Sequence, residues 1–365
     1  MKRNAMINYC FFNTISAWGG GEKWHLDVAS YLHKKGASVV VVAVQNSPLS
    51  KKAEALGIEV RHIKLSNLSF LNPMVVYRVA RLLRRYSVNS LIINSPRDLK
   101  CAGLAAWFIN TPNVIFRRGS DIAIKNTVLN RFLYQKVVHK VLVNSPATQT
   151  SLNANNAQLV AKSKIKLVPN GIDSDKFLDA PFSPIYEKNT DEFVLCTLGR
   201  LVPQKNHEFL IDLAVELKRR QLHFKLLIGG SGPLEGDLKQ KARSAGVSGS
   251  IVFKGFIERP KDLYSSGDVF LLPSLWEGFG YVLAEAGLSA LPSVAFDVSS
   301  NSQIIQDGKT GFLVPESNTS LFADALIKLW QNEKLRNEMG EAAKRFVRKN
   351  FEAERIFKEI EYAIS

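Results

Sequence analysis

Apolar, β-branched runs alternate with amphipathic helical segments along the chain, in two successive halves. The run at residues 39–44 contains five valines and an alanine, a composition typical of a strand buried on both faces. Helical periodicity flanks such runs, for example at residues 22–35 and 73–86. Strands that alternate with helices of this length predict an α/β fold, in which helices cover both faces of a parallel sheet.

A chain of 365 residues is too long for one ordinary hydrophobic core and fits two domains. The periodicity lapses into Asp, Pro, Ser and Lys between residues 170 and 189, and the alternation begins again at residue 193. We therefore predict two doubly wound domains, residues 1–172 and residues 173–345. Doubly wound sheets bind ligands where the carboxyl ends of strands meet helix N-termini, so we expect a site in a cleft that the two domains face.

The net charge of +15 is concentrated in the first half of the chain. Residues 1–170 contain 24 Lys and Arg against 6 Asp and Glu, a balance of +18, whereas residues 171–365 contain 24 against 27, a balance of −3. This asymmetry predicts an anionic partner for the first half, such as a membrane surface, a nucleic acid or a phosphorylated substrate.

Two basic amphipathic segments favour the membrane surface among these partners. Residues 125–140 form one of them, and in the other, residues 73–86, arginines recur at helical spacing beside Val75, Val79, Leu82 and Leu83. Segments of this kind lie in membrane interfaces next to anionic lipid. The same apolar faces could instead cover the sheet, which would leave the cations to solubility or to an anionic acceptor. The arginines are Arg78, Arg81, Arg84 and Arg85.

The cysteines and the apolar segments bear on the compartment. Cys10, Cys101 and Cys196 are far apart and lie in apolar surroundings, which predicts reduced thiols instead of disulfides. No segment approaches the ~20 consecutive apolar residues that span a bilayer. We expect a cytoplasmic protein that associates peripherally with the cytoplasmic membrane.

The most informative stretch is residues 268–286, where a buried strand, a Gly-rich loop and a helix follow one another. The N–H groups at the start of this helix, together with its dipole, would form an anion site suited to a pyrophosphate. Glu277 before the helix and Glu285 on it can accept hydrogen bonds from sugar hydroxyls. Glu285, between two alanines, could equally be a solvated surface residue. The N–H groups concerned are those of Gly280, Tyr281, Val282 and Leu283.

Two further strand-to-helix turns carry cationic or glycine-rich sequences. Arg200 and Lys205 lie in the loop at residues 199–206, where two cations can neutralise a diphosphate leaving group. Taken alone, this loop is more simply explained as a solvated basic loop. Gly230 and Gly232, after another strand, let the backbone approach a nucleotide closely, which is a weak indication by itself.

Taken together, these motifs and three others, in this order along the chain, resemble glycosyltransferase family 4. The six are G-G-G at residues 19–21, P-N-G-I-D at 169–173, G-R-L-x-x-x-K-N at 199–206, G-x-G-P at 230–233, K-G-F at 254–256 and E-G-F-G-x-x-x-x-E at 277–285. The resemblance implies the GT-B fold, with two Rossmann-like domains, and a retaining, metal-independent enzyme that uses a nucleotide sugar. It also implies that a C-terminal helix, residues 346–365, crosses back onto the N-terminal domain. Residues 321–364 look helical, with breaks expected near Gly340 and Asn350.

The resemblance implies catalytic roles for three side chains. Arg200 and Lys205 would bind the donor pyrophosphate. Glu277 would contact the donor sugar, helped by the backbone N–H groups of Phe279 and Gly280. Arg200, Lys205 and the helix dipole would stabilise the departing diphosphate by electrostatic preorganisation.

It also implies further contacts with the donor. Glu285 would bind the ribose hydroxyls, and the backbone around Phe256 and Ile257 would read the edge of the base. Gly20 and Gly21 would close over the phosphates or the acceptor.

The chain departs from the family at one position and offers a misleading motif at another. Many relatives have a histidine at the end of an N-domain strand where this chain has Arg117, Arg118 and Asp121 nearby, which are therefore candidates for the acceptor side. Asp173 and Asp175 match the D-x-D pattern by which other glycosyltransferases hold a metal, but Asp173 is better explained as a turn residue. No other cluster of His, Cys and carboxylates offers metal ligands, so no metal cofactor is expected.

We predict a retaining glycosyltransferase that moves a sugar from a UDP- or GDP-sugar to a hydroxyl of a glycan or lipid-linked acceptor. Bacterial-type cell-envelope polysaccharide or lipopolysaccharide synthesis is the expected setting. A GT-B epimerase or phosphorylase is the alternative within the fold. A non-enzymatic basic protein that binds nucleic acid or other anions is the alternative from another class, although the sequence has no helix-turn-helix, zinc-finger or RNP-like motif.

Overall fold

The computed structural model describes residues 8–189 and 191–365 and divides the chain into two compact units. Unit 1 consists of Met1–Gly171 and Glu354–Ser365, and unit 2 of Ile172–Ala353. The expected boundary after residue 172 lies one residue from this division. The expected boundary after residue 345 differs from it, because the segment that follows still belongs to unit 2, where Val347 and Phe351 are buried in the core.

Unit 1 is built on a parallel sheet of seven strands in the order β3-β2-β1-β4-β5-β6-β7. The valine-rich run predicted as a buried strand forms β2, which is covered on both faces. The strand order reverses direction beside β1, which pairs with both β2 and β4. The strands are β1 (Asn8–Phe12), β2 (Ser38–Ala43), β3 (Glu59–His62), β4 (Ser90–Ile93), β5 (Asn113–Arg118), β6 (Lys140–Val143) and β7 (Ile165–Leu167).

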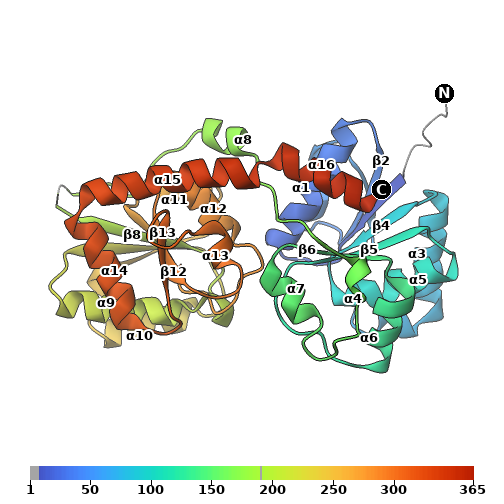
Figure 1. Cartoon of the computed structure of the whole chain (residues 1–365), viewed down its shortest axis with the longest axis horizontal. Coiled ribbons are helices and arrows are strands. Elements are labelled where there is room, and N and C mark those ends of the chain that lie inside the picture. Colours follow the sequence, from blue (N-terminus) through green and yellow to red (C-terminus); the bar gives the residue numbers. More distant parts are fainter. Residues whose placement is uncertain (1–7, 190) are drawn as a thin grey trace. The chain divides into compact units, whose positions relative to one another are not determined.

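Helices connect these strands and pack against the sheet (Figure 1). The two long ones early in the chain, α1 (Gly20–Lys34) and α3 (Pro73–Arg85), each bury one face. The segment predicted as one helix at residues 127–139 is a short helix followed by a π-helical turn. The shorter elements are α2 (Pro48–Ala55), η1 (Ser69–Leu71), α4 (Pro96–Asp98), η2 (Leu99–Gly103), α5 (Leu104–Phe108), α6 (Val128–Phe132), η3 (Leu133–Val137), α7 (Pro146–Leu152) and η4 (Lys162–Lys164).

The C-terminal helix α16 (Ala353–Ile364) packs in unit 1. Carbonyl oxygens at its end accept hydrogen bonds from the first residues of strands: Ser90 Oγ donates to Ile364 O over 2.7 Å, and Lys140 Nζ donates to Ala363 O over 2.8 Å. These bonds satisfy carbonyls that lack a partner within the helix. The end of the chain is therefore fixed to the amino edge of the sheet.

Unit 2 repeats the architecture with a parallel sheet of six strands in the order β10-β9-β8-β11-β12-β13. The order reverses beside β8, which pairs with β9 and β11. A topological switch point of this kind is the expected ligand position in such a sheet. The strands are β8 (Phe193–Leu198), β9 (Phe224–Gly229), β10 (Ile251–Gly255), β11 (Val269–Leu272), β12 (Ser293–Phe296) and β13 (Gly311–Val314).

The helices of unit 2 include one in the segment predicted to be a linker, α8 (Ser174–Asp179). The expected break near Gly340 is wrong, because α15 (Glu333–Phe351) runs through it: a Cβ at this position would lie 2.0 Å from Ala290 O, so glycine permits close packing. The break expected near Asn350 falls at Glu352, between α15 and α16, and a further break falls at Asn332. The others are η5 (Pro203–Lys205), α9 (His207–Arg219), α10 (Glu235–Ser244), η6 (Ser248–Ser250), α11 (Pro260–Tyr264), α12 (Tyr281–Leu288), α13 (Asn301–Ile304) and α14 (Thr319–Gln331).

The three cysteines are buried, as their apolar surroundings in the sequence indicated. Cys10, Cys101 and Cys196 are buried free thiols, and burial raises the pKa of Cys101 to about 11. They are therefore poor nucleophiles.

Within the part of the chain that the structure describes, no helix combines the length and the apolarity needed to cross a membrane.

Candidate functional site

Four loops of unit 2 leave the carboxyl edge of four strands that are adjacent in the sheet: β10, β9, β8 and β11. Because the carboxyl ends of parallel strands meet at one edge, the fold brings together the motifs found in the sequence. The loops are residues 256–258 after β10, 230–233 after β9, 199–206 after β8 and 273–280 after β11.

Gly230 and Gly232 allow two of these loops to touch. A Cβ on Gly230 would lie 1.9 Å from Gly199 O, and φ at Gly230 is +123°. A Cβ on Gly232 would lie 2.4 Å from Leu201 O, and Leu201 N–H donates to Ser231 O over 3.0 Å. These glycines therefore shape the site through loop–loop contact, which the sequence motif did not reveal.

An ion pair joins the loop after β8 to the loop after β11. Lys205 Nζ lies 2.5 Å from Glu277 Oε1, and these side chains are only 15% and 7% exposed. Ser274 Oγ donates to the same Oε1 over 2.7 Å. Among the described residues no group bonds to Glu277 Oε2, which leaves that oxygen to accept a hydrogen bond from a ligand hydroxyl.

Backbone contacts fix the geometry of this pair. Leu275 N–H donates to Gln204 O over 2.9 Å, and Gln204 Nε2 donates to Trp276 O over 2.9 Å. Gln204 immediately precedes Lys205, and Trp276 immediately precedes Glu277, so the two charged side chains start from backbones that are bonded to each other. A preorganised arrangement of this kind is what electrostatic stabilisation requires.

The helix α12 begins beside the ion pair. Its N-cap, Gly280, has a φ of +76° and provides no side-chain cap, so no capping side chain neutralises the positive end of the helix dipole. Tyr281 and Val282 form the first turn and are half-buried. The ring of Phe279 is buried 5.2 Å from that of Phe351, so only the backbone of Phe279 can reach a ligand.

Glu285 is held in place further along α12. Its side chain is half-buried, and Tyr264 Oη donates to Glu285 Oε2 over 3.1 Å. Burial, and then the charge of Glu285, raise the pKa of the Tyr264 hydroxyl well above its usual value, so the hydroxyl stays protonated as a donor. Glu285 is thus an oriented carboxylate and not a fully solvated one.

Two further side chains extend from the same edge. Arg200 is exposed and forms no ion pair with any described residue, so its charge is free to meet an anionic ligand. Phe256 is 75% exposed, an unusual fraction for a large aromatic ring. Ile257, next to it, is half-buried against Gly229.

In unit 1, Gly20 and Gly21 begin α1 after the loop that follows β1. A Cβ on Gly21 would lie 2.3 Å from Asn94 Nδ2, so a larger residue here would displace the Asn94 amide. Asn94 Oδ1 in turn accepts a hydrogen bond from Arg117 Nη1 over 3.1 Å. Arg117 therefore lies behind the glycine turn, linked to it through Asn94.

Arg117 and Arg118, two of the acceptor-side candidates, are both buried and have different partners. Successive residues of a strand point to opposite faces, and both arginines end β5. Arg117 is 5% exposed, donates to Asn170 Oδ1 over 3.0 Å and lies 5.3 Å from the Trp24 ring centroid. Arg118 donates to Ile122 O, and burial lowers its pKa, which the charge of the half-buried Asp121 partly offsets.

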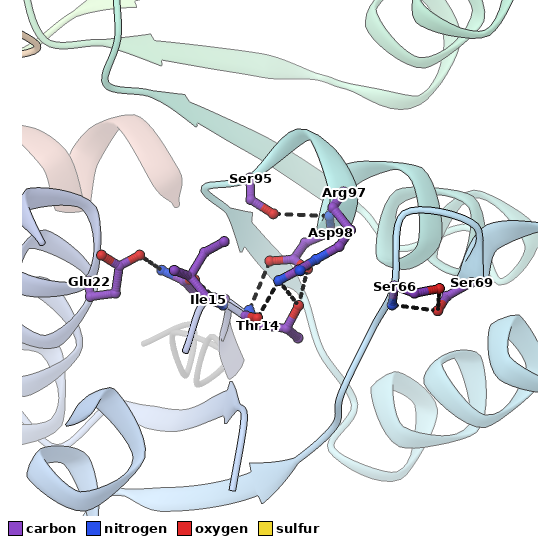
Figure 2. A network of polar contacts seen from close by, with 9 residues as sticks. Thr14, Ile15, Glu22, Ser66, Ser69, Ser95, Arg97 and Asp98 are labelled. Carbon is purple, nitrogen blue, oxygen red and sulfur yellow. Dashed lines mark hydrogen bonds and ion pairs between the residues drawn. The ribbon is translucent and has the colours of Figure 1, made fainter. Parts of the chain in front are cut away.

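A buried polar network fixes the loop after β1, which precedes the glycine turn (Figure 2). Asp98, which is fully buried, accepts hydrogen bonds from the N–H and the hydroxyl of Thr14, and Arg97 donates to Thr14 O. Asn13 Nδ2 donates to Glu22 Oε1 over 3.0 Å. Burial raises the pKa of Asp98, and the bonds from Thr14 oppose this shift. The sequence contained no motif that pointed to this network.

Asp173 and Asp175 have structural partners. Asp173 caps α8 by accepting a hydrogen bond from Lys176 N–H over 3.0 Å, as expected for a turn residue. Asp175 pairs with Arg348 over 2.8 Å. The described residues contain no group of three or more His, Cys, Asp or Glu that could hold a metal ion.

Two family models match the chain, one in each half. The model described as "Glycosyltransferase Family 4" matches residues 18–176, and the model described as "Glycosyl transferases group 1" matches residues 180–346. Between them they cover all six motifs and every strand of the two sheets except β1.

Relatives and solved structures agree with this assignment. The putative glycosyltransferase EpsF of Bacillus subtilis is 25% identical over 76% of this chain and 76% of its own length. An Escherichia coli protein named UDP-Gal:alpha-D-GlcNAc-diphosphoundecaprenol alpha-1,3-galactosyltransferase is 29% identical, over 47% of this chain and 46% of its own length. The crystal structure of Anabaena HepE in complex with UDP-glucose matches with a TM-score of 0.82 at 19% identity, over 98% of each chain. The chain belongs to glycosyltransferase family 4 and is a glycosyltransferase of the GT-B type.

Proposed function

We propose that this glycosyltransferase transfers a sugar from a UDP- or GDP-sugar to a hydroxyl of a glycan or lipid-linked acceptor, with retention of configuration and without a metal. The observation that carries the proposal is the Lys205–Glu277 pair at the meeting point of four strand-end loops. The pair places a cation, an oriented carboxylate and a helix N-terminus within one edge of one sheet.

The cations serve the departing nucleoside diphosphate. Lys205 is paired with Glu277 and has further N–H groups to donate, while the exposed Arg200 supplies a second cation from the same loop. The positive end of the α12 dipole adds to them. Donors fixed by the backbone in this way stabilise charge that develops in the transition state, typically by about 3–4 kcal/mol for each donor.

The carboxylates serve the neutral parts of the donor. Glu277 Oε2 accepts from a hydroxyl of the transferred sugar, since Oε1 is already occupied by Lys205 and Ser274. Glu285, oriented by Tyr264, accepts from the ribose hydroxyls. Phe256 provides an exposed ring beside the base, and the glycines of the turn at 230–233 keep the backbone close.

We expect retention of the anomeric configuration because neither carboxylate is assigned to activate water or to act as a nucleophile. We assign Glu277, which is paired with Lys205, and Glu285, which is bonded to Tyr264, to binding the donor, so neither acts as a base or a nucleophile in this proposal. The acceptor hydroxyl attacks the face that the diphosphate leaves, and its proton passes to a phosphate oxygen of the donor. The sugar bond to phosphate breaks as the new glycosidic bond forms, so no further reagent is needed.

The acceptor assignment rests on relatives and on charge. The E. coli relative is named for a diphosphoundecaprenol acceptor, and unit 1 of this chain carries most of the positive charge. Since Arg117 and Arg118 are buried, we assign them to positioning the glycine turn and the end of β5, and the acceptor contact to the surface around Gly20.

A calorimetric screen of UDP-, GDP- and ADP-sugars tests the donor class, followed by transfer assays with the sugar nucleotide that binds. Nuclear magnetic resonance of the product then gives the configuration of the new bond, and retention is expected. Activity should persist in excess EDTA. Loss of activity in EDTA with rescue by Mn²⁺ or Mg²⁺ would contradict the metal-free mechanism, and binding of none of the three donors would contradict the donor class.

A further inference from the structure

An apolar pocket of about 520 Å³ lies in unit 1 between α3 and the α5 segment, which contact each other on the same side of the sheet (Figure 1). Its size falls within the range of small-molecule sites, roughly 300–1,000 Å³. The glycosyltransferase motifs contribute nothing to it. The residues that line it are apolar except for Tyr77 and Arg84: Phe70, Pro73, Val76, Tyr77, Ala80, Arg84, Leu104, Phe108 and Ile109.

Large apolar side chains surround the mouth of this pocket and remain exposed. Tyr77 and Phe108, which line it, are 61% and 63% exposed. The ring of Trp107 lies 5.1 Å from that of Phe108 and 5.2 Å from that of Phe132. Soluble surfaces rarely keep a group of this kind uncovered. Nearby in the sequence, Leu68 before η1, Leu71 at its end and Met74 at the start of α3 are exposed as well.

The surroundings of the pocket are basic with almost no counter-charge. Residues 60–120 contain 10 Lys and Arg and one acidic residue, Asp98, which is fully buried. Arg78, Arg81, Arg84 and Arg85 are exposed on α3 itself. Lys100 Nζ lies 5.5 Å from the centroid of Phe70, at the pocket wall. The charge thus favours an anionic occupant, and the apolar lining favours a hydrocarbon one.

We propose that this pocket binds a hydrocarbon chain of an anionic membrane lipid and docks unit 1 on a bilayer surface. The chain enters between α3 and α5, and Arg84, whose stem lines the pocket, extends its guanidinium to the lipid phosphate. Tyr77 and Trp107 lie at the level of the head groups, the position that amphipathic aromatic rings prefer. Lipid binding at this pocket would place the protein on the membrane, and it does not depend on the donor chemistry.

The structure changes which residues of α3 take part. The apolar residues first considered for membrane contact cover the sheet: Val79 and Leu83 are buried, and Val75 and Leu82 are packed against the core. The residues left for lipid are Met74, Tyr77 and the arginines, which lie on another side of the same helix. The pocket therefore supplies the apolar contact that the buried face of α3 cannot.

Nucleic acid fits this surface less well than lipid. A phosphate backbone would pair with the arginines but would leave the pocket and its exposed rim in water, whereas a lipid satisfies both. Stacking on bases would need aromatic rings along a groove, and Phe108, Trp107 and Phe132 instead contact one another edge to face.

Sedimentation of the full chain with vesicles tests the charge requirement. The protein should bind phosphatidylcholine vesicles that contain about 30% phosphatidylglycerol at low salt, and bind pure phosphatidylcholine far less. The triple variant Arg81→Ser, Arg84→Ser and Arg85→Ser should bind on the order of 100-fold more weakly, because each cation contributes separately near anionic lipid. The matched control removes three exposed cations from unit 2, Arg243→Ser, Lys309→Ser and Lys349→Ser, and should bind normally.

Quenching of Trp107 tests whether a hydrocarbon chain occupies the pocket. The vesicles have the same composition, with bromine on their acyl chains. The fluorescence of Trp107, taken as the difference between the wild type and Trp107→Phe, should fall by about half or more on binding, because bromine quenches on contact. Tyr77→Ser and Phe108→Ser should each weaken vesicle binding at least about tenfold, since each removes a large side chain from the lipid contact.

Three results would overturn the proposal. They are no vesicle binding at low salt, equal loss of binding in the unit 1 and unit 2 charge variants, and vesicle binding that leaves Trp107 unquenched. Binding to DNA with none to vesicles would replace the lipid by a nucleic acid. Transfer to a water-soluble acceptor analogue serves as an independent check on folding, and it should be unchanged in every variant named here.

Discussion

The carboxyl edges of the two sheets differ in how their polar groups are partnered. In unit 2 the loops keep Arg200 exposed and leave Oε2 of Glu277 without a partner among the described residues. In unit 1, Asp98 of α4 and Arg117 of β5 are buried and bonded to neighbouring residues of the same edge. Polar groups that bond to one another fix a backbone, whereas groups left partly unsatisfied can bind a ligand.

We infer from this difference that the two sheets, although similar in architecture, have different functions. In the function proposed above, unit 2 carries the donor chemistry, because its charges are oriented but accessible. In unit 1, Asn94 and Thr14 help to fix the backbone near the glycine turn. The helices of unit 1 also carry the pocket and the basic and apolar residues around it. The variants below test this assignment, in order of decreasing expected effect.

The largest effect is expected at the ion pair. Lys205→Ala and Glu277→Ala should each lower the transfer rate by about 10²–10³-fold, because each removes a preorganised group at the reacting centre. Steady-state release of the nucleoside diphosphate measures it. The exposed pair Lys239–Glu235, 2.6 Å apart on α10, provides the control: Lys239→Ala should change the rate little. Near-normal rates in either ion-pair variant would remove that residue from the mechanism.

The glycine turn of unit 2 should show the next largest effect. Gly230→Ala places a Cβ 1.9 Å from Gly199 O at a φ of +123°, so we expect the free energy of unfolding to fall by about 3 kcal/mol and donor affinity to fall with it. Gly236→Ala is the matched control in the following helix, where a Cβ meets nothing within 4 Å. It should stabilise slightly. Equal denaturant midpoints for the two variants would contradict the loop–loop contact.

Removal of Arg117 tests whether this side chain of unit 1 serves stability or donor binding. Arg117→Met leaves Asn94 and Asn170 without their hydrogen-bond donor, so the free energy of unfolding should fall by about 2 kcal/mol. Donor affinity measured by calorimetry should stay within about twofold, because this side chain serves structure. A stable variant with donor affinity lost would show instead that Arg117 binds the donor, in the role of the family histidine.

The smallest effect is a dependence on pH in unit 1. His25 is buried against Phe11 and Trp24, and burial, with a smaller contribution from Arg117, lowers its pKa to about 3. The folded state keeps this ring neutral while the unfolded state takes up a proton below about pH 6.5. Its contribution to stability is therefore complete above pH 6.5 and lost as the pH falls toward 3.

Substitution of His25 should remove this acid sensitivity. Between pH 6.5 and 5.5 the wild type should lose about 1.4 kcal/mol or less through His25, and His25→Phe should not. Since both ring nitrogens of His25 are buried without hydrogen bonds among the described residues, His25→Phe should also be neutral or stabilising at pH 7.5. His33→Phe, at an exposed position of the same helix, is the control. An unchanged pH profile in His25→Phe would place the sensitivity elsewhere.

The sequence predicted those parts of the molecule that depend on local pattern. The valine run of β2, the alternation of strands and helices and the strand-end positions of Lys205 and Glu277 all follow from periodicity and spacing. The family resemblance, carried by six short motifs, is confirmed by both family models.

The parts that the sequence did not predict depend on contacts between distant segments. Gly340 was expected to break a helix, but it packs against Ala290 O, a contact that only the fold creates. Arg117 and Arg118 were candidates for the acceptor side, and the fold buries both of them. Ser274, Gln204 and Tyr264 support the site through bonds to residues that only the fold brings near. No residue type or spacing marks such contacts in advance.

Hydrogen exchange on the full chain, with and without the sugar nucleotide that binds, tests the division of tasks most directly. The expected result is new protection at residues 199–206, 230–233, 255–258 and 274–283 of unit 2, with residues 63–109 of unit 1 unchanged. Protection that is concentrated in residues 63–109, with the four loops of unit 2 unaffected, would contradict the assignment of donor chemistry to unit 2.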